Sequence, residues 1–212
     1  MKKTFLIFLI TLGSCRFEPD ADVVVETRGV ASEALYRELG LEGEVDLAAF
    51  DRAAEGFRRV AGRRKEILSF IDFTLPSTEK RLWVIDMARR RVLFNTWVAH
   101  GRESGELYAT SFSNRRGSHK SSLGFYLTAE TYIGRNGYSL MIDGLDAGLN
   151  DNARGRAVVV HGAWYADPRV IASMGRLGRS FGCPALPPDL ARPIIDSIKG
   201  GSVLYIHGFV GR

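Results

Sequence analysis

The sequence of 212 residues is poor in cysteine and histidine, with two of the first and four of the second. No His-x-x-x-His or His-x-His pair occurs, so the ligand spacing typical of zinc peptidases is missing and no metal site is expected. The formal charge of +5 is spread along the chain, without a long basic run or patterned aromatics. Nucleic-acid binding is therefore not indicated. The two cysteines are Cys15 and Cys183, and the four histidines are His100, His119, His161 and His207.

The apolar run Phe5 to Leu12 is too short to span a bilayer as a helix. It follows Lys2 and Lys3 and precedes a small-residue pair, which is the pattern of a signal peptide over residues 1–14. We therefore expect an exported protein of the periplasm or cell envelope. Loss of the two lysines would lower the formal charge from +5 to +3.

The end of this leader, residues 12–15, reads Leu-Gly-Ser-Cys and resembles the lipobox of bacterial lipoproteins. In such proteins the cysteine becomes the lipidated first residue, so Cys15 would anchor the chain to a membrane. Plain secretion is the alternative. In either case Cys183 is left without an intrachain partner in a compartment that permits disulfides, which favours a reactive thiol.

A tether and an N-terminal helical segment are expected over residues 15–63. Residues 32–39 look like a short helix. From Asp46 to Ala61 the apolar residues repeat every three or four positions, which predicts an amphipathic helix that packs on the domain, capped by Asp46 and ended by Gly62.

The remainder, residues 64–212, is expected to form one mainly β domain with peripheral helices. The runs 81–87 and 91–99 predict a hairpin, and further strands are predicted at 124–132, 138–142, 157–161 and 203–207. A helix is predicted at 188–199, begun by Pro-Asp and ended by two glycines.

The strongest chemical pattern joins His161-Gly162 to Ser180-Phe181-Gly182-Cys183. An apolar strand that ends in His-Gly would hold an imidazole at its tip, beside a cleft. A glycine before the cysteine permits a tight turn whose amides can face an oxyanion. A nucleophilic thiol needs such a neighbouring base, and a backbone oxygen such as the Gly162 carbonyl could orient that base. The residues alone favour a purely structural cysteine and histidine over a catalytic pair.

This pair of motifs resembles the L,D-transpeptidase catalytic domain of the YkuD type, whose signature is His-Gly or His-Ser followed by Ser-His-Gly-Cys. The likeness is closer to a divergent branch, the murein L,D-transpeptidase catalytic domain proteins, and extends over residues 72–208. It implies a β-sandwich-like domain and acyl transfer on peptidoglycan stem peptides without a cofactor. Cys183 would be the nucleophile and His161 its base.

The resemblance also implies a 3-3 crosslink, made when Cys183 releases D-Ala from a stem and a second stem's amine takes the acyl group. The Gly182 and Cys183 amides are candidate oxyanion donors, and Ser180 is expected to shape the turn. The same thioester could instead pass to water, as in an L,D-carboxypeptidase or amidase. A non-catalytic wall-binding lipoprotein is a further alternative.

Two positions depart from the family pattern. Phe181 replaces the usual second histidine, and Ala185 stands where an arginine is common. Arg176 and Arg179 could supply the missing guanidinium for a substrate carboxylate. The polar loop around His119 and Lys120 is a candidate wall of the cleft, although a solvated loop is as plausible.

Two other patterns are weaker. Residues 77–80 match the Ser-x-x-Lys motif of penicillin-binding enzymes, but the sequence has no Ser-x-Asn triplet, which those enzymes also need. His100-Gly101 lacks a paired cysteine motif, so we expect a structural role for His100.

Overall fold

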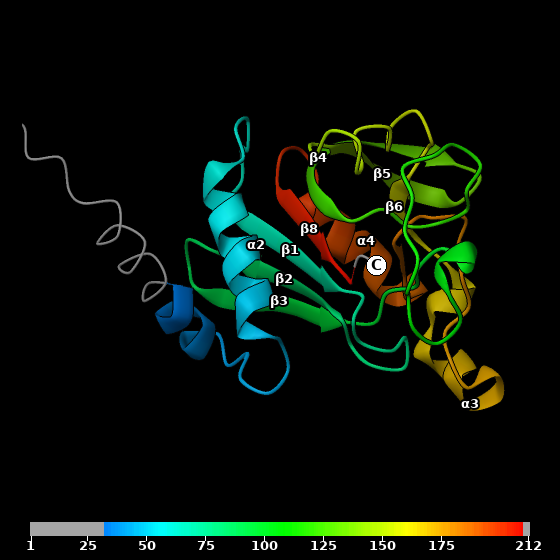
Figure 1. The fold of residues 1–212 in the computed structure, drawn as a ribbon, viewed down its shortest axis with the longest axis horizontal. Coiled ribbons are helices and arrows are strands. Elements are labelled where there is room, and N and C mark those ends of the chain that lie inside the picture. The colour runs from blue at the N-terminus through cyan, green and yellow to red at the C-terminus, as the bar shows by residue number, and fades with distance from the viewer. Residues whose placement is uncertain (1–31, 210–212) are drawn as a thin grey trace, which may run out of the picture.

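The computed structural model describes residues 32–209 and consists of one eight-stranded sheet with a few helices (Figure 1). The mainly β class is confirmed, in the form of a single continuous sheet that curls. Register shifts in the β2–β3 and β4–β5 pairs mark bulges, which increase local twist. The strands are β1 (Ile67–Asp72), β2 (Leu82–Asp86), β3 (Arg91–Thr96), β4 (Gly124–Gly134), β5 (Gly137–Gly144), β6 (Val159–Gly162), β7 (Ala185–Leu186) and β8 (Val203–His207).

The strand order is β3-β2-β1-β8-β4-β5-β6-β7, so the last strand of the chain lies in the middle of the sheet. β8 pairs in parallel with β1 and antiparallel with β4. In Figure 1 this red strand joins the β1–β3 part to the β4–β6 part. The site at β6 and β7 is therefore at one end of the sheet.

The predicted hairpin is confirmed as β2 and β3, and the predicted β4, β5, β6 and β8 are found within a few residues of the expected bounds. Two strands were not predicted. β1 is buried along nearly its whole length and thus lacks the polar–apolar alternation of a half-buried strand. β7 has only two residues.

Helix α2 (Leu47–Arg59) packs on one face of the sheet, as expected from its apolar stripe. Phe50 and Phe57 are buried there against β1 and β8 residues such as Phe70. The predicted end at Gly62 is wrong, because Val60 already has extended backbone and forms the C-cap. Residues 32–38 are helical, close to the predicted range, and lie before α2.

The N-cap of α2 gives a direct test of its start. Asp46 Oδ1 accepts the Ala49 backbone N–H at 2.8 Å. Asp46→Ala should lower the free energy of unfolding by about 1 kcal/mol, because that N–H loses its acceptor. Asp46→Asn should cost much less, because an asparagine oxygen caps equally well. Urea denaturation of both variants measures the difference, and equal losses would contradict a capping role.

Helix α4 (Pro188–Ile198) covers the opposite face and begins with proline as predicted. Its buried Ile194, Ile195 and Ile198 pack with Tyr126 and other apolar side chains of the sheet. Short helical turns occupy residues 102–104, 164–166 and 168–170, and α3 (Ile171–Met174) follows. These turns and α3 lie in the loops near β6 and β7.

The predicted signal peptide, tether start and Cys15 lie outside the described residues. Between residues 32 and 209 no helix combines the length and apolar character needed to cross a bilayer.

Candidate active site

The end of the sheet brings the two predicted motifs together. β6 carries His161, and β7 follows the Cys183 loop directly. The two strands pair in parallel with His161 opposite Ala185, so the cysteine loop lies beside β6. Ala185 is fully buried in a small apolar cluster with Ala99.

The Ser180–Cys183 turn is held by one hydroxyl. Ser180 Oγ donates to the Cys183 carbonyl at 2.6 Å and accepts the Gly182 N–H at 3.0 Å. This is the turn-shaping role expected of Ser180. It also corrects the expectation for Gly182, whose N–H is already used and is not free for an oxyanion. Within residues 32–209 the Cys183 N–H has no acceptor, so it is the better donor.

Gly182 is required for its backbone conformation rather than as a hydrogen-bond donor. Its φ of +121° lies in the region that favours glycine. A Cβ there would lie 2.8 Å from the Lys120 carbonyl oxygen. Ser121 Oγ donates to the Gly182 carbonyl at 3.1 Å and accepts the Gly101 N–H at 3.0 Å. The 101–121 loop thus packs tightly against the cysteine turn.

The Cys183 thiol is free and buried, with 8% of the residue exposed. Its Sγ lies 3.5 Å from the Val159 N–H and 3.7 Å from the Ala157 carbonyl oxygen. Burial raises the pKa of this thiol, while the Val159 N–H and the Arg156 charge act in the opposite direction. The thiol is therefore protonated at neutral pH until a base takes its proton.

The His161 imidazole is oriented by a backbone oxygen, as predicted. Nδ1 lies 3.0 Å from the Gly162 carbonyl oxygen, so in the neutral ring Nδ1 carries the proton and Nε2 has the lone pair. Burial lowers the pKa of His161, opposed by that hydrogen bond. No hydrogen bond joins His161 to Sγ in the described part of the chain, so proton transfer requires the two side chains to come within hydrogen-bond reach.

Arg156 is a site residue that the sequence analysis did not find. Its guanidinium donates to the Ser113 and Lys120 carbonyl oxygens, at 2.6 and 2.5 Å, and to the Ser122 hydroxyl at 3.2 Å. It therefore joins the 113–122 segment to the loop before β6. Its charge is the main cationic influence on the Cys183 pKa. Only the fold brings these partners together.

Removing the charge of Arg156 should make the thiol harder to ionise. In Arg156→Met we expect the pH midpoint for iodoacetamide alkylation of Cys183 to rise, and the rate at pH 8 to fall about three- to tenfold. Arg154→Met is the matched control, because Arg154 lies in the same loop but pairs with Asp143 and Glu130 at the surface. An unchanged or lower midpoint in Arg156→Met would count against this role.

Arg176 and Arg179 lie near the site but have a carboxylate partner already. Arg176 Nη2 and Arg179 Nη1 bind the two oxygens of Glu106 at 2.8 and 2.7 Å. Arg179 also donates to the Arg102 and Gly105 carbonyl oxygens. A substrate carboxylate would have to displace Glu106, so the structure lends this hypothesis no support.

Phe181 forms an exposed aromatic surface two residues before Cys183. The ring is 65% exposed, lies 4.7 Å from the His119 ring and has the Arg102 guanidinium 5.1 Å above it. Lys120 Nζ donates to Ser111 Oγ at 2.6 Å. His119 therefore lies beside the cysteine turn, with Lys120 next to it in the chain. That the two residues form the wall of a cleft and contact substrate stays a prediction.

His100 has the structural character expected of it. Arg81 donates to its Nδ1 at 2.8 Å, and Nε2 lies 3.2 Å from the Gly105 carbonyl oxygen. Burial and the Arg81 charge lower its pKa to about 3, so the ring is neutral.

The Ser-x-x-Lys pattern at residues 77–80 does not present its serine to solvent. Ser77 is buried, and its hydroxyl accepts the Leu177 N–H. In the described residues, no three His, Cys, Asp or Glu side chains gather in a way that could hold a metal ion.

Comparison with protein families then decides the class of the domain. The family model described as "L,D-transpeptidase catalytic domain" matches residues 41–207, which is most of the chain. The chain belongs to the L,D-transpeptidase catalytic domain family. The matched range begins before α2, so it includes this helix as well as the sheet. No curated protein matches the sequence.

Solved structures are similar at low identity. An L,D-transpeptidase from Mycobacterium smegmatis is 16% identical with a TM-score of 0.41, over 68% of this chain and 59% of that one. The helical cell shape determining protein Pgp2 from Campylobacter jejuni is 14% identical with a TM-score of 0.45, over 70% and 50%. An L,D-transpeptidase from Stackebrandtia nassauensis is 16% identical with a TM-score of 0.40, over 85% and 78%. The chain thus spans less than two thirds of the first two proteins.

Proposed function

We propose that this domain is a peptidoglycan L,D-transpeptidase with Cys183 as its nucleophile. The observation that carries the proposal is the pairing of β6 with β7, which sets an oriented neutral imidazole beside a Ser180-held cysteine turn. Membership of the family favours acyl transfer as the reaction class. The arrangement has the three parts that such a reaction needs: a thiol, a base and a free amide for the oxyanion.

In the proposed first step His161 Nε2 accepts the thiol proton, and Sγ attacks the carbonyl of the third stem residue. The developing oxyanion accepts a hydrogen bond from the Cys183 N–H. The bond to the terminal D-alanine breaks, and its amine leaves with the proton held by His161. A thioester on Cys183 remains.

In the second step the amine of another stem attacks the thioester. His161 accepts the proton of that amine, and the Cys183 sulfur leaves and regains a proton from His161. The product is a 3-3 crosslink, and the enzyme returns to its starting state. Water in place of the amine would give a carboxypeptidase.

Muropeptide analysis tests this proposal. Purified peptidoglycan is treated with the protein, and new 3-3 dimers are expected together with released D-alanine. Trimmed stems without dimers would identify the hydrolase instead. An unchanged profile, together with no mass adduct on Cys183 after carbapenem treatment, would reject the enzyme and favour a wall-binding protein.

We further propose that the chain is exported and anchored through a lipid on Cys15, on the strength of its leader pattern. Expression in a bacterium should then place the protein in the membrane fraction with a mass increase at the new N-terminus. Cys15→Ser should release it from that fraction. A wild-type protein found only in the soluble fraction would reject the anchor.

A further inference from the structure

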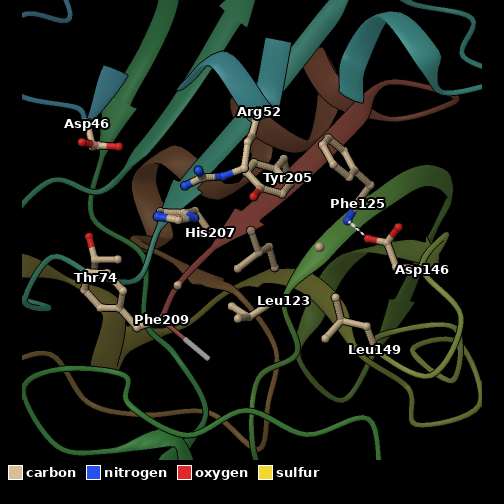
Figure 2. A pocket seen from close by; sticks show the side chains of 13 residues that line it. Asp46, Arg52, Thr74, Leu123, Phe125, Asp146, Leu149, Tyr205, His207 and Phe209 are labelled. Atoms are coloured by element: carbon tan, nitrogen blue, oxygen red, sulfur yellow. Dashed lines mark hydrogen bonds between the residues drawn. The ribbon is translucent and has the colours of Figure 1, made fainter. Parts of the chain in front are cut away.

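A second cavity lies away from the cysteine turn. It has a volume of about 640 Å³, a size common for small-ligand sites, and lies between the N-terminal part of α2 and the strands β4 and β8 (Figure 2). No residue of the 180–183 turn or of β6 lines it. We call it the Phe209 cavity; its principal side chains are those of Asp46, Arg52, Asp146, Tyr205, His207 and Phe209.

The cavity has an aromatic floor and an exposed aromatic edge. The Tyr205 ring stacks on Phe125 with centroids 4.3 Å apart, and the His207 ring follows at 6.2 Å. Phe209 packs its ring against His207 at 64° and is 71% exposed. A phenylalanine so exposed contributes little to the core, whereas its open face suits the C–H face of a ligand ring.

Polar groups surround this floor in fixed positions. Asp146 Oδ2 accepts the Phe125 N–H at 2.7 Å, and a Cβ at residue 124 would collide with that oxygen. Gly124 therefore makes room for the carboxylate. Among the described residues Oδ1 of Asp146 has no hydrogen-bond partner. Across the cavity, Arg52 extends from α2 beside the Tyr205 phenol (Figure 2).

The side chains that line the cavity indicate which class of ligand it would bind. Two carboxylates, Asp46 and Asp146, face one guanidinium, which disfavours a strongly anionic ligand. The floor strand β8 is paired on both sides, so a peptide cannot add to it as a strand. Aromatic faces combined with fixed acceptors and a donor suit a neutral ring that carries hydroxyl and amide groups.

The cavity is joined to the cysteine turn by one short segment. Leu123 lines the cavity, while Ser121 binds the Gly182 carbonyl and Ser122 accepts from Arg156. The segment 121–123 therefore contributes at one end to the cavity and at the other to the packing of the cysteine turn.

We propose that the Phe209 cavity binds a neutral N-acetylhexosamine ring of a glycan strand, while the stem peptide of that strand reaches Cys183. This inference extends the proposed function, because it names the part of the wall polymer that the protein holds outside its reaction centre.

The test is calorimetric titration of the full chain carrying Cys183→Ala with tetra-N-acetylchitotetraose. Saturable binding is expected, with affinity lowered about tenfold or more by Phe209→Ala and by Arg52→Ala. Both side chains are exposed, so these variants should fold. Tyr132→Ala is the matched control, since Tyr132 is an exposed aromatic of β4 that does not line the cavity, and its affinity should not change.

Three outcomes would overturn the proposal: no saturable binding, equal affinity in all variants, or displacement of the sugar by a free stem tetrapeptide. Because the titration uses a protein without the thiol, its result does not depend on turnover. If the protein forms 3-3 dimers but does not bind the sugar, only the inference about the cavity is rejected. If it binds the sugar but Cys183 is never acylated, only the proposed reaction is rejected.

Discussion

Cys183→Ala is expected to lower turnover of tetrapeptide stems by on the order of 10⁴-fold or more, because no covalent intermediate can form. The change removes one buried sulfur, whose contacts are the Val159 N–H and the Ala157 carbonyl oxygen. The fold should therefore survive. Release of D-alanine, measured over time with wild type and variant, gives the ratio.

Cys183→Ser provides the matched comparison for this variant. A hydroxyl fits the same space but ionises far less readily, so it should also be nearly inactive. Thermal unfolding of both variants checks that activity is lost without loss of structure. Turnover within tenfold of wild type in Cys183→Ala would show that another group is the nucleophile.

His161→Gln is expected to slow formation of the thioester by about 10² to 10⁴-fold, the usual contribution of a general base. Glutamine retains a donor for the Gly162 carbonyl, so the strand end should be preserved, but it cannot accept the thiol proton at neutral pH. Mass spectrometry of the carbapenem adduct on Cys183 against time measures the rate.

The pH dependence separates a base from a merely structural residue. Burial lowers the pKa of His161 and raises that of Cys183. Between those two pKa values both groups are neutral, so the wild-type rate should be level there and fall only as acid protonates His161. In His161→Gln the rate should instead rise about tenfold per pH unit with the thiolate fraction. A level profile in the variant would exclude His161 as the base.

Local sequence patterns predicted most of the elements that carry the site. The apolar run before His161 predicted β6, and the proline, aspartate and double glycine bracketed α4. The role of Ser180 and the orientation of His161 by Gly162 also followed, because both depend on neighbours close in the chain. Such contacts are fixed by the turn itself and need no knowledge of the rest of the fold.

Contacts between distant segments could not be predicted in this way. The pairing of Arg176 and Arg179 with Glu106, some seventy residues earlier, removes two free cations that their position near Cys183 suggested. Arg156 gained its role through carbonyl oxygens of the 113–120 segment. Strand β1 was missed because burial on both faces erases the two-residue period.

The central place of β8 also bears on how the molecule acquires its structure. Until residues 203–207 are available, β1 and β4 both present unpaired edges, and neither half of the sheet is complete. Folding of the sheet must therefore wait for β8, and pairing of β1 with β8 closes a loop of more than a hundred residues. A ribosome-bound fragment ending before β8 should remain open and susceptible to proteases, and the thiol would gain its environment only after β8 has joined the two parts of the sheet.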